Sequence, residues 1–315
     1  MVEDENIKTT VSPFAIREGE IKKFDGKDAY VSISQIIHKI NLGHINDIHF
    51  AILDLVNEFE FMTSRQIYFM LLERGVEIKS QDKLNVKLEQ MIKSKILTRY
   101  FFTSEEGKGI YRVYCLEKMG KYLLNSKETE CKWQPTDNTK PVAMIKKRLA
   151  GNQVIIAYMR KAKNFDTYRV KPQITAKMAD KTIKTHAEVK ITKTTKTTSK
   201  SISLLFEVVR RELGWEHNFV DRMRLFKDFY DNFVPFDCGF NIMPQLILVC
   251  EDEKHMVETL KQIIANNLMP EKVKIYFTTD LKQNDTTLGK SFIEFVKDEE
   301  NGKFKANNIE IKLLG

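Results

Sequence analysis

Closely spaced cysteines are missing from this sequence of 315 residues. The four cysteines stand far apart, and no two form the CxxC arrangement from which zinc fingers and ribbons are built. The spacing therefore argues against a structural zinc site. It is typical of a chain whose thiols stay reduced, and it predicts a cytoplasmic protein. The cysteines are Cys115, Cys131, Cys238 and Cys250.

Long apolar runs are missing as well. No stretch reaches the roughly 18 consecutive apolar residues that a membrane-spanning helix needs. The first ten residues, MVEDENIKTT, are acidic and polar and lack the apolar segment of a signal peptide. We therefore expect no membrane partner for the chain.

The common nucleotide-binding and hydrolase motifs do not occur either. The sequence has no GxxxxGK(S/T) loop and no GxGxxG loop after a strand, and its six histidines form no HExxH pair. No serine lies in a GxSxG turn. We expect no cofactor, except that Mg²⁺ or Mn²⁺ would be required if the chain were a nuclease.

The residues that are present indicate a globular, basic chain. Hydrophobic residues make up 42% and aromatic residues 10% of the sequence, which is enough for packed cores. The length allows two domains. The net charge of +8 favours an anionic partner, either nucleic acid or an anionic lipid surface, and does not choose between them.

Three helices, a pair of strands and a last helix are predicted within residues 45–126. Apolar residues recur at the spacing of one helical face in three successive segments, and two strand-like runs follow, joined by the turn EEGKG. Residues 1–44 are predicted to be a weakly ordered lead-in segment. The helices are predicted over 45–61, 62–75, 80–95 and 117–126, and the strands over 96–104 and 109–116.

This order of elements resembles a winged helix-turn-helix domain, whose third helix enters the major groove of DNA. With Leu84, Leu88 and Met91 turned inward, the lysines of the third helix face outward, where they can neutralise phosphates. The polar residues between them can reach base edges. Alternatively, the lysines are ordinary solvated surface and the domain binds another protein. The resemblance implies DNA binding by Lys79, Ser80, Lys83, Asn85, Lys87, Gln90, Arg99, Lys108 and Arg112.

A second domain is predicted over residues 141–315, after a polar linker over 127–140 that contains Pro135. Helical and strand-like segments follow one another, and the apolar run PQLILVC is of the kind that lies in the middle of a sheet. The predicted fold class is therefore α+β or α/β. The strands are predicted over 168–178, 185–194, 201–211, 244–252 and 273–280, with a terminal hairpin over 291–314.

The order of these elements is that of a restriction-endonuclease-like, or PD-(D/E)XK-like, core. Over residues 45–280 the chain resembles the replication-relaxation family of plasmids and mobile elements, which joins a winged helix to a nuclease-like domain. The segment FEVV, residues 206–209, stands where that family has a Glu-x-Asp or Glu-x-Lys motif. Lys227 and Tyr230 match a family helix, and the run at 244–250 matches a later strand.

Two positions depart from the family pattern and leave Glu207 with two interpretations. Gln173 is neutral where the family has Asp, and Val209 is apolar. A catalytic magnesium ion needs several oxygen ligands, so the preferred hypothesis is a buried acid paired with Arg210, Arg211 or Arg222 in a domain that does not cleave. The alternative is an active metal-dependent nuclease that uses Glu207 with help from Glu188, Lys190 or Lys227.

A long basic hairpin is predicted around residues 177–200, which contain seven lysines, seven threonines and only two acids. Alternation in the run EVKITKTTK is expected to put many of the lysines on one face. Such a hairpin can lie along a DNA backbone through Lys190, Lys193 and Lys196. Alternatively, the lysines protect an exposed sheet edge from unwanted pairing.

Together these features give the hypothesis of a DNA-binding protein of a plasmid or mobile element. The winged helix would select a site on double-stranded DNA, and the nuclease-like domain would serve as a second, non-cleaving platform. The family resemblance implies a role in replication, relaxation or transfer, with replication or transfer proteins or a second copy of the chain as further partners. The alternatives are the nuclease described above, and a transcriptional regulator or protein-interaction scaffold.

Overall fold

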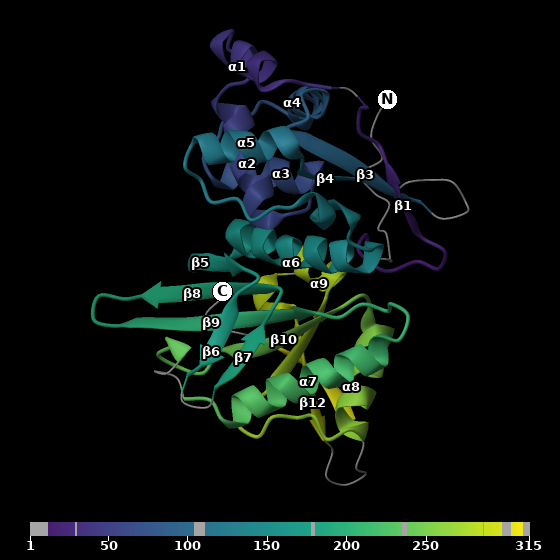
Figure 1. Ribbon diagram of the computed structural model, residues 1–315. Helices are drawn as coiled ribbons and strands as arrows, with labels where there is room; N and C mark the ends of the chain where they lie inside the picture. The colour runs from purple at the N-terminus through teal and green to yellow at the C-terminus, as the bar shows by residue number, and fades with distance from the viewer. Residues whose placement is uncertain are drawn as a thin grey trace. The chain divides into compact units, whose positions relative to one another are not determined.

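The computed structural model of the protein describes residues 12–28, 30–103, 111–177, 180–234, 238–285, 287–297 and 304–310 (Figure 1). Its contacts divide the chain into an N-terminal unit, residues 16–156, and a C-terminal unit, residues 1–15 together with 157–315. The boundary lies inside one continuous helix, α6 (Val142–Lys161), whereas the sequence pattern sets the start of the second domain at residue 141.

Side-chain caps determine where helices of the N-terminal unit begin. The Thr63 hydroxyl accepts a hydrogen bond from the backbone N–H of Gln66, whose side chain accepts one from the N–H of Thr63, and Ser80 accepts from the N–H of Lys83. These caps confirm two helix starts predicted from the sequence. The helices are α1 (Ile33–Asn41), α2 (Asp47–Phe59), α3 (Ser64–Glu73), α4 (Gln81–Lys93) and α5 (Lys118–Ser126).

The sheet of the N-terminal unit includes a strand that the sequence pattern missed. Its antiparallel order in the described residues is β1-β3-β4-β2. The two strands predicted over 96–104 and 109–116 are confirmed as β3 and β4, while the turn between them lies outside the described residues. The strands are β1 (Ile21–Phe24), β2 (Met62–Thr63), β3 (Leu97–Thr103) and β4 (Arg112–Leu116).

The prediction of a weakly ordered lead-in is wrong for the described residues around β1. Strand β1 pairs with β3 along its length, and Glu20 just before it forms an ion pair with the fully buried Lys146. Lys22 donates hydrogen bonds to the carbonyl oxygens of Asn138 and Lys140, at 2.7 and 2.8 Å. These partners lie far away in the sequence, so no local pattern indicated them.

The predicted linker, residues 127–140, also carries structure. Residues Pro135–Thr139 form a 3₁₀ helix, and Asn138 within it is buried. The Asn138 side chain donates a hydrogen bond to the carbonyl oxygen of Leu116 at 2.9 Å and accepts one from the indole N–H of Trp133 at 3.1 Å. The segment is therefore attached to β4 through buried polar contacts.

The C-terminal unit is built on a mixed sheet with the strand order β13-β12-β11-β10-β9-β8-β5 among the described residues. Strands β9, β10 and β11 run parallel, and the other neighbouring pairs are antiparallel. The α+β class predicted from the sequence is confirmed at this level. The strands are β5 (Phe165–Val170), β8 (Ala187–Thr194), β9 (Ser199–Val208), β10 (Gln245–Cys250), β11 (Ile275–Thr279), β12 (Phe292–Lys297) and β13 (Phe304–Ile309).

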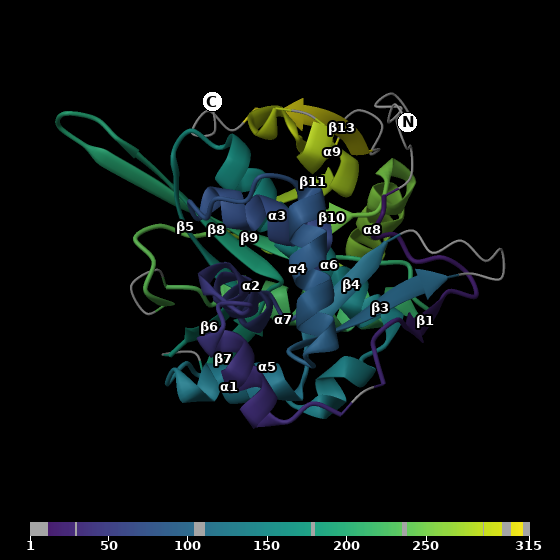
Figure 2. The same cartoon turned by 90° about the horizontal axis from the view of Figure 1, so that it is seen from above.

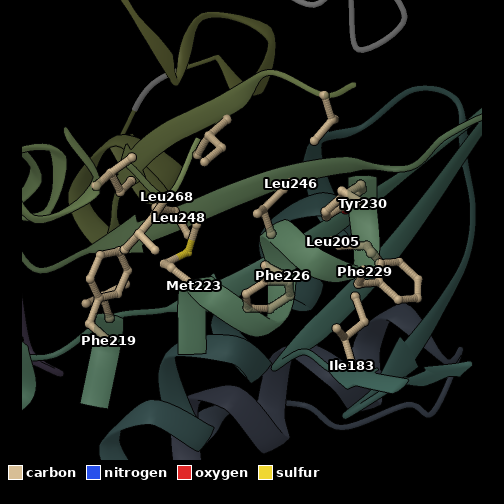
Figure 3. Close-up of a cluster of buried hydrophobic side chains, with 14 of the residues drawn as sticks. Ile183, Leu205, Phe219, Met223, Phe226, Phe229, Tyr230, Leu246, Leu248 and Leu268 are labelled. Carbon is tan, nitrogen blue, oxygen red and sulfur yellow. The ribbon is translucent and has the colours of Figure 1, made fainter. Parts of the chain in front are cut away.

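Helices α7 (Trp215–Asp231) and α8 (Glu253–Ala265) cover one face of this sheet with apolar side chains. Phe219, Met223 and Phe226 of α7 pack against Leu246 and Leu248 of β10 (Figure 3). The alternation of β9 and β10 sends their remaining apolar side chains to the opposite face. There the ring of Tyr158, near the end of α6, lies 5.3 Å from that of Phe206.

The single strand predicted over 168–178 is wrong, because the chain turns in its middle. Lys171 has a positive φ of 48° and is followed by Pro172, which cannot donate to a strand ladder. Strand β5 therefore ends at Val170, and β6 (Gln173–Ala176) pairs instead with β7 (Lys181–Lys184), which was not predicted. Gln173 is exposed on this separate hairpin.

Removing a buried leucine from the C-terminal core is expected to destabilise this unit strongly. Leu248→Ala should lower the free energy of unfolding by about 2–5 kcal/mol, because it leaves a cavity at a side chain that is fully buried. The same change at Leu225, which is 54% exposed on α7, should cost less than about 0.5 kcal/mol. Urea unfolding followed by Trp215 fluorescence, in a Trp133→Phe background, measures both; equal costs would contradict the described core.

Candidate functional site

Helix α4 has one buried face and one face that carries basic and polar side chains. Leu84, Leu88, Met91 and Ile92 are at most 1% exposed and fix the orientation of the helix. On the other side, Lys83 and Asn85 are exposed and Lys87 is half-buried, and Lys79 is exposed just before the helix. Within the described part of the chain, none of these three lysines forms an ion pair. Their charges therefore face solvent.

Two other residues predicted to bind DNA on α4 are engaged within the unit. Ser80 caps the helix, as described above. The side chain of Gln90 lies 3.1 Å from Nε2 of the buried His49 on α2, whose Nδ1 lies 3.0 Å from the side chain of Asn46. Burial lowers the pKa of His49, and the nearby charge of Lys87 lowers it further. Gln90 therefore joins α4 to α2.

The arginines of β3 and β4 share an acid that follows β1. Asp25 lies 2.8 Å from Arg99 Nε and 2.9 Å from Arg112 Nε. Arg99 also pairs with Glu89 at 3.0 Å, and its side chain is only 11% exposed. Arg112 remains 60% exposed. Of these two predicted DNA-binding residues, Arg112 is therefore the more accessible, while Lys108 lies outside the described residues.

The carboxylate of Glu207, on β9, lies within hydrogen-bond distance of the side chains of Arg222 and His186. Arg222 Nε on α7 lies 2.9 Å from Oε1, and His186 Nδ1 lies 3.1 Å from Oε2. Burial alone would raise the pKa of the Glu207 carboxyl, but His186 and Arg222 together outweigh burial and hold the pKa below its ordinary value. The prediction that Glu207 is a paired acid is confirmed, with Arg222 as the partner.

The other candidates for a catalytic site have partners of their own. Glu188 forms an ion pair with Arg169 on the neighbouring strand β5. Lys190 lies 3.4 Å from Asp166. Lys227 binds Asp231 and the carbonyl oxygen of Met269, at 2.9 and 3.1 Å. The described contacts of Glu207 involve none of these candidates.

Arg210 and Arg211, the other two arginines considered for Glu207, bind acids at the carboxyl ends of the parallel strands. Arg210 is buried and makes two hydrogen bonds of 2.8 Å to Asp280, which directly follows β11. Arg211 makes two hydrogen bonds to Asp252, at 2.6 and 3.0 Å. Both arginines therefore connect β9 to the ends of β10 and β11. No local pattern in the sequence indicates this choice of partners.

The basic hairpin predicted around residues 177–200 is confirmed as β8 and β9, which pair antiparallel. The expectation that its lysines share one face is wrong in part. Lys190 and Lys193 are three positions apart and point to opposite faces, because strand side chains alternate. Lys193 instead lies directly opposite Lys200 of β9. Lys193, Lys196 and Lys200 are all exposed.

Removing Arg222 is expected to leave a buried carboxylate with insufficient compensation. Arg222→Met should lower the free energy of unfolding by about 3 kcal/mol, since breaking a buried ion pair costs more than breaking an exposed one. Lys190→Met provides the control, because its pair with Asp166 is largely exposed and should contribute less than about 1 kcal/mol. Urea unfolding at neutral pH measures both. Equal effects of the two changes would contradict the assignment.

The pH dependence of the same variant supplies a second measurement. A carboxyl whose pKa is lowered in the folded state stabilises that state above its ordinary pKa, near 4.5, and this stabilisation is lost as the pH falls through the lowered value. Without Arg222, burial shifts the Glu207 pKa of the variant upward, so the stability difference between the unmodified protein and Arg222→Met should be largest at neutral pH and shrink as the pH falls into the acid range. A difference that persists in acid would point to lost packing by Arg222.

Within the described residues, no three His, Cys, Asp or Glu side chains are grouped so that they can hold a metal ion. The helices of the described part of the chain also lack the combined length and hydropathy that crossing a bilayer requires.

No protein family matches the sequence, and comparisons with curated proteins and with solved structures give no match.

Proposed function

We propose that the protein binds double-stranded DNA, that its N-terminal unit is a winged helix-turn-helix domain, and that α4 is the helix that enters the major groove. The observation that carries the proposal is the outward face of α4. It presents Lys83, Asn85 and Lys87 toward solvent, with Lys79 exposed just before the helix, while the opposite face is buried in the core. Lysines at such positions neutralise phosphates, and an asparagine can bond to an adenine edge.

The connection of the strands supports the winged-helix assignment. A short strand, β2, lies between α2 and α3 and pairs with β4, which also pairs with β3. The order helix, strand, helix, helix and then two antiparallel strands is that of a winged helix-turn-helix domain. Pairing of β2 with β4 holds the start of α3 beside the two later strands. In this proposal β3 and β4 form the wing, and Arg112 is its accessible cation.

The C-terminal unit, in the same proposal, is a restriction-endonuclease-like domain that does not cleave DNA. The mixed sheet with α7 and α8 on one face supports the fold assignment. The absence of cleavage is supported by the contacts of Glu207, because Arg222 and His186 occupy the oxygens that a divalent cation would need. The resemblance to the replication-relaxation family extends the proposal to replication or transfer of a plasmid or mobile element.

Neutralising two lysines of α4 is expected to weaken DNA binding. Lys83→Gln/Lys87→Gln should reduce the affinity of the full chain for duplex DNA by about tenfold at low salt. The slope of the logarithm of the binding constant against the logarithm of the salt concentration should fall by the amount expected for about two phosphate contacts. Fluorescence anisotropy with a labelled duplex, repeated at several salt concentrations, measures both quantities.

The matched control is Lys118→Gln/Lys132→Gln, which removes the same charge from exposed positions on and after α5. If the two double variants bind equally, the effect comes from net charge alone and α4 has no special place in binding. Circular dichroism checks that both variants are folded. Full affinity in the α4 variant would contradict the proposal.

Removing the acid that is paired with the wing arginines is expected to strengthen DNA binding. Asp25→Asn should leave Arg112 without its carboxylate, so that a phosphate can take that place. We expect an affinity about threefold higher and a salt dependence that is steeper by about one phosphate contact. Asp28→Asn, a change at an exposed neighbour with the same charge difference, is the control. Equal effects of the two changes would exclude Arg112 from the interface.

A further inference from the structure

The tip of the β8–β9 hairpin extends beyond the other strands of its sheet. Pairing of β5 with β8 ends at Ile191, and pairing of β10 with β9 begins at Leu204. Residues 193–200, here called the ribbon, therefore pair only with each other. Both views of the structure show the ribbon projecting away from the rest of its own unit (Figure 2). It forms an isolated two-stranded element with both faces accessible.

The ribbon carries three lysines and no acid. Acidic residues are absent from the whole stretch 189–206. Lys193 and Lys200 are direct cross-strand neighbours, and Lys196 lies in the turn between the strands. Like charges placed directly opposite each other destabilise a strand pair. In the described part of the chain none of the three lysines has an ion-pair partner, whereas Lys190, on the other face, is paired with Asp166.

Hydroxyl groups complete the surface of the ribbon. The Thr194 hydroxyl lies 3.3 Å from that of Ser199, and the Thr195 hydroxyl lies 2.9 Å from that of Thr198. Hydroxyl side chains commonly donate hydrogen bonds to phosphate oxygens. The ribbon therefore presents cations and neutral donors together, and residues 193–200 include no apolar side chain.

We propose that the ribbon binds the phosphate backbone of duplex DNA, independently of α4. A phosphate shared by Lys193 and Lys200 would relieve the repulsion between the two ammonium groups, while Lys196 and the hydroxyls would contact neighbouring phosphates. A two-stranded ribbon has the size that the major groove of B-form DNA admits, about 12 Å wide. The major groove of an RNA duplex is too narrow for side chains to enter. Binding through phosphates carries no preference for base sequence.

The composition of the ribbon argues for DNA over a lipid surface. Amphipathic segments that insert into membranes add apolar or aromatic side chains that enter the acyl region, in addition to their basic residues. The turn of the ribbon, TTKTT, has none. Its lysines and threonines are instead suited to a charged and hydrated partner. The partner is shared with the proposed function, but the residues belong to the other unit.

The test compares two pairs of lysines in the full chain. Lys193→Gln/Lys200→Gln is expected to reduce affinity for a duplex of arbitrary sequence by about tenfold, and to lower the salt dependence by about two phosphate contacts. Lys181→Gln/Lys190→Gln removes the same charge from lysines that are paired with Asp228 and Asp166, and it should have little effect. Lys193→Arg/Lys200→Arg should retain binding.

Thermal unfolding of Lys193→Gln/Lys200→Gln shows whether a loss of affinity comes from lost contacts with DNA or from unfolding of the variant. Because the two lysines repel each other, the midpoint should stay the same or rise. Unchanged DNA affinity in the folded variant would overturn the inference. Equal losses of DNA affinity in the two glutamine variants would also overturn the inference. So would a result in which Lys193→Gln/Lys200→Gln binds duplex DNA normally and loses only its binding to duplex RNA or to phosphatidylserine vesicles.

The outcome for α4 is read separately. Should Lys83→Gln/Lys87→Gln bind normally while Lys193→Gln/Lys200→Gln binds weakly, the proposed role of α4 fails and the inference about the ribbon stands. The reverse result would retain the role of α4 and reject the ribbon.

Discussion

A charge that leaves water must meet an opposite charge, and in this protein that requirement joins segments that are distant in the sequence. Lys146 meets Glu20, which attaches the first strand of the N-terminal unit. Arg210 meets Asp280 and connects the ends of two parallel strands. The exposed lysines of α4 and of the ribbon have no such partner among the described residues. Ion pairing therefore joins distant segments, while these two cationic surfaces face solvent.

Local patterns were sufficient for the elements whose signals are local. Apolar spacing predicted α2, α3 and α4, and the structure has hydroxyl caps at the starts of α3 and α4. Strand β1 was missed because its residues, IKKF, are mostly exposed and its partner strand lies almost eighty residues away. The break at Lys171 depends on its positive φ, which the apolar alternation of the surrounding residues does not indicate.

The site residues also divide into those that a local pattern identified and those that only contacts between distant segments bring together. The position of Glu207 within an apolar strand segment identified it from the sequence and limited its partner to three arginines. The packing of α7 on the sheet then selects Arg222 among them. His186 reaches Glu207 because β8 and β9 are antiparallel, and register of that kind is not encoded in composition. The opposite faces of Lys190 and Lys193, by contrast, follow from their spacing alone and could have been predicted.

The isolation of the ribbon makes the protein susceptible to proteolysis. An exposed tip with small polar residues is a preferred site of proteolytic attack, and this tip offers lysines, after which trypsin-like enzymes cut. A nick after Lys196 would separate the polypeptide into two fragments. Strands β8 and β9 would nevertheless remain hydrogen-bonded to each other and to β5 and β10. The clipped protein would hold together as a non-covalent complex.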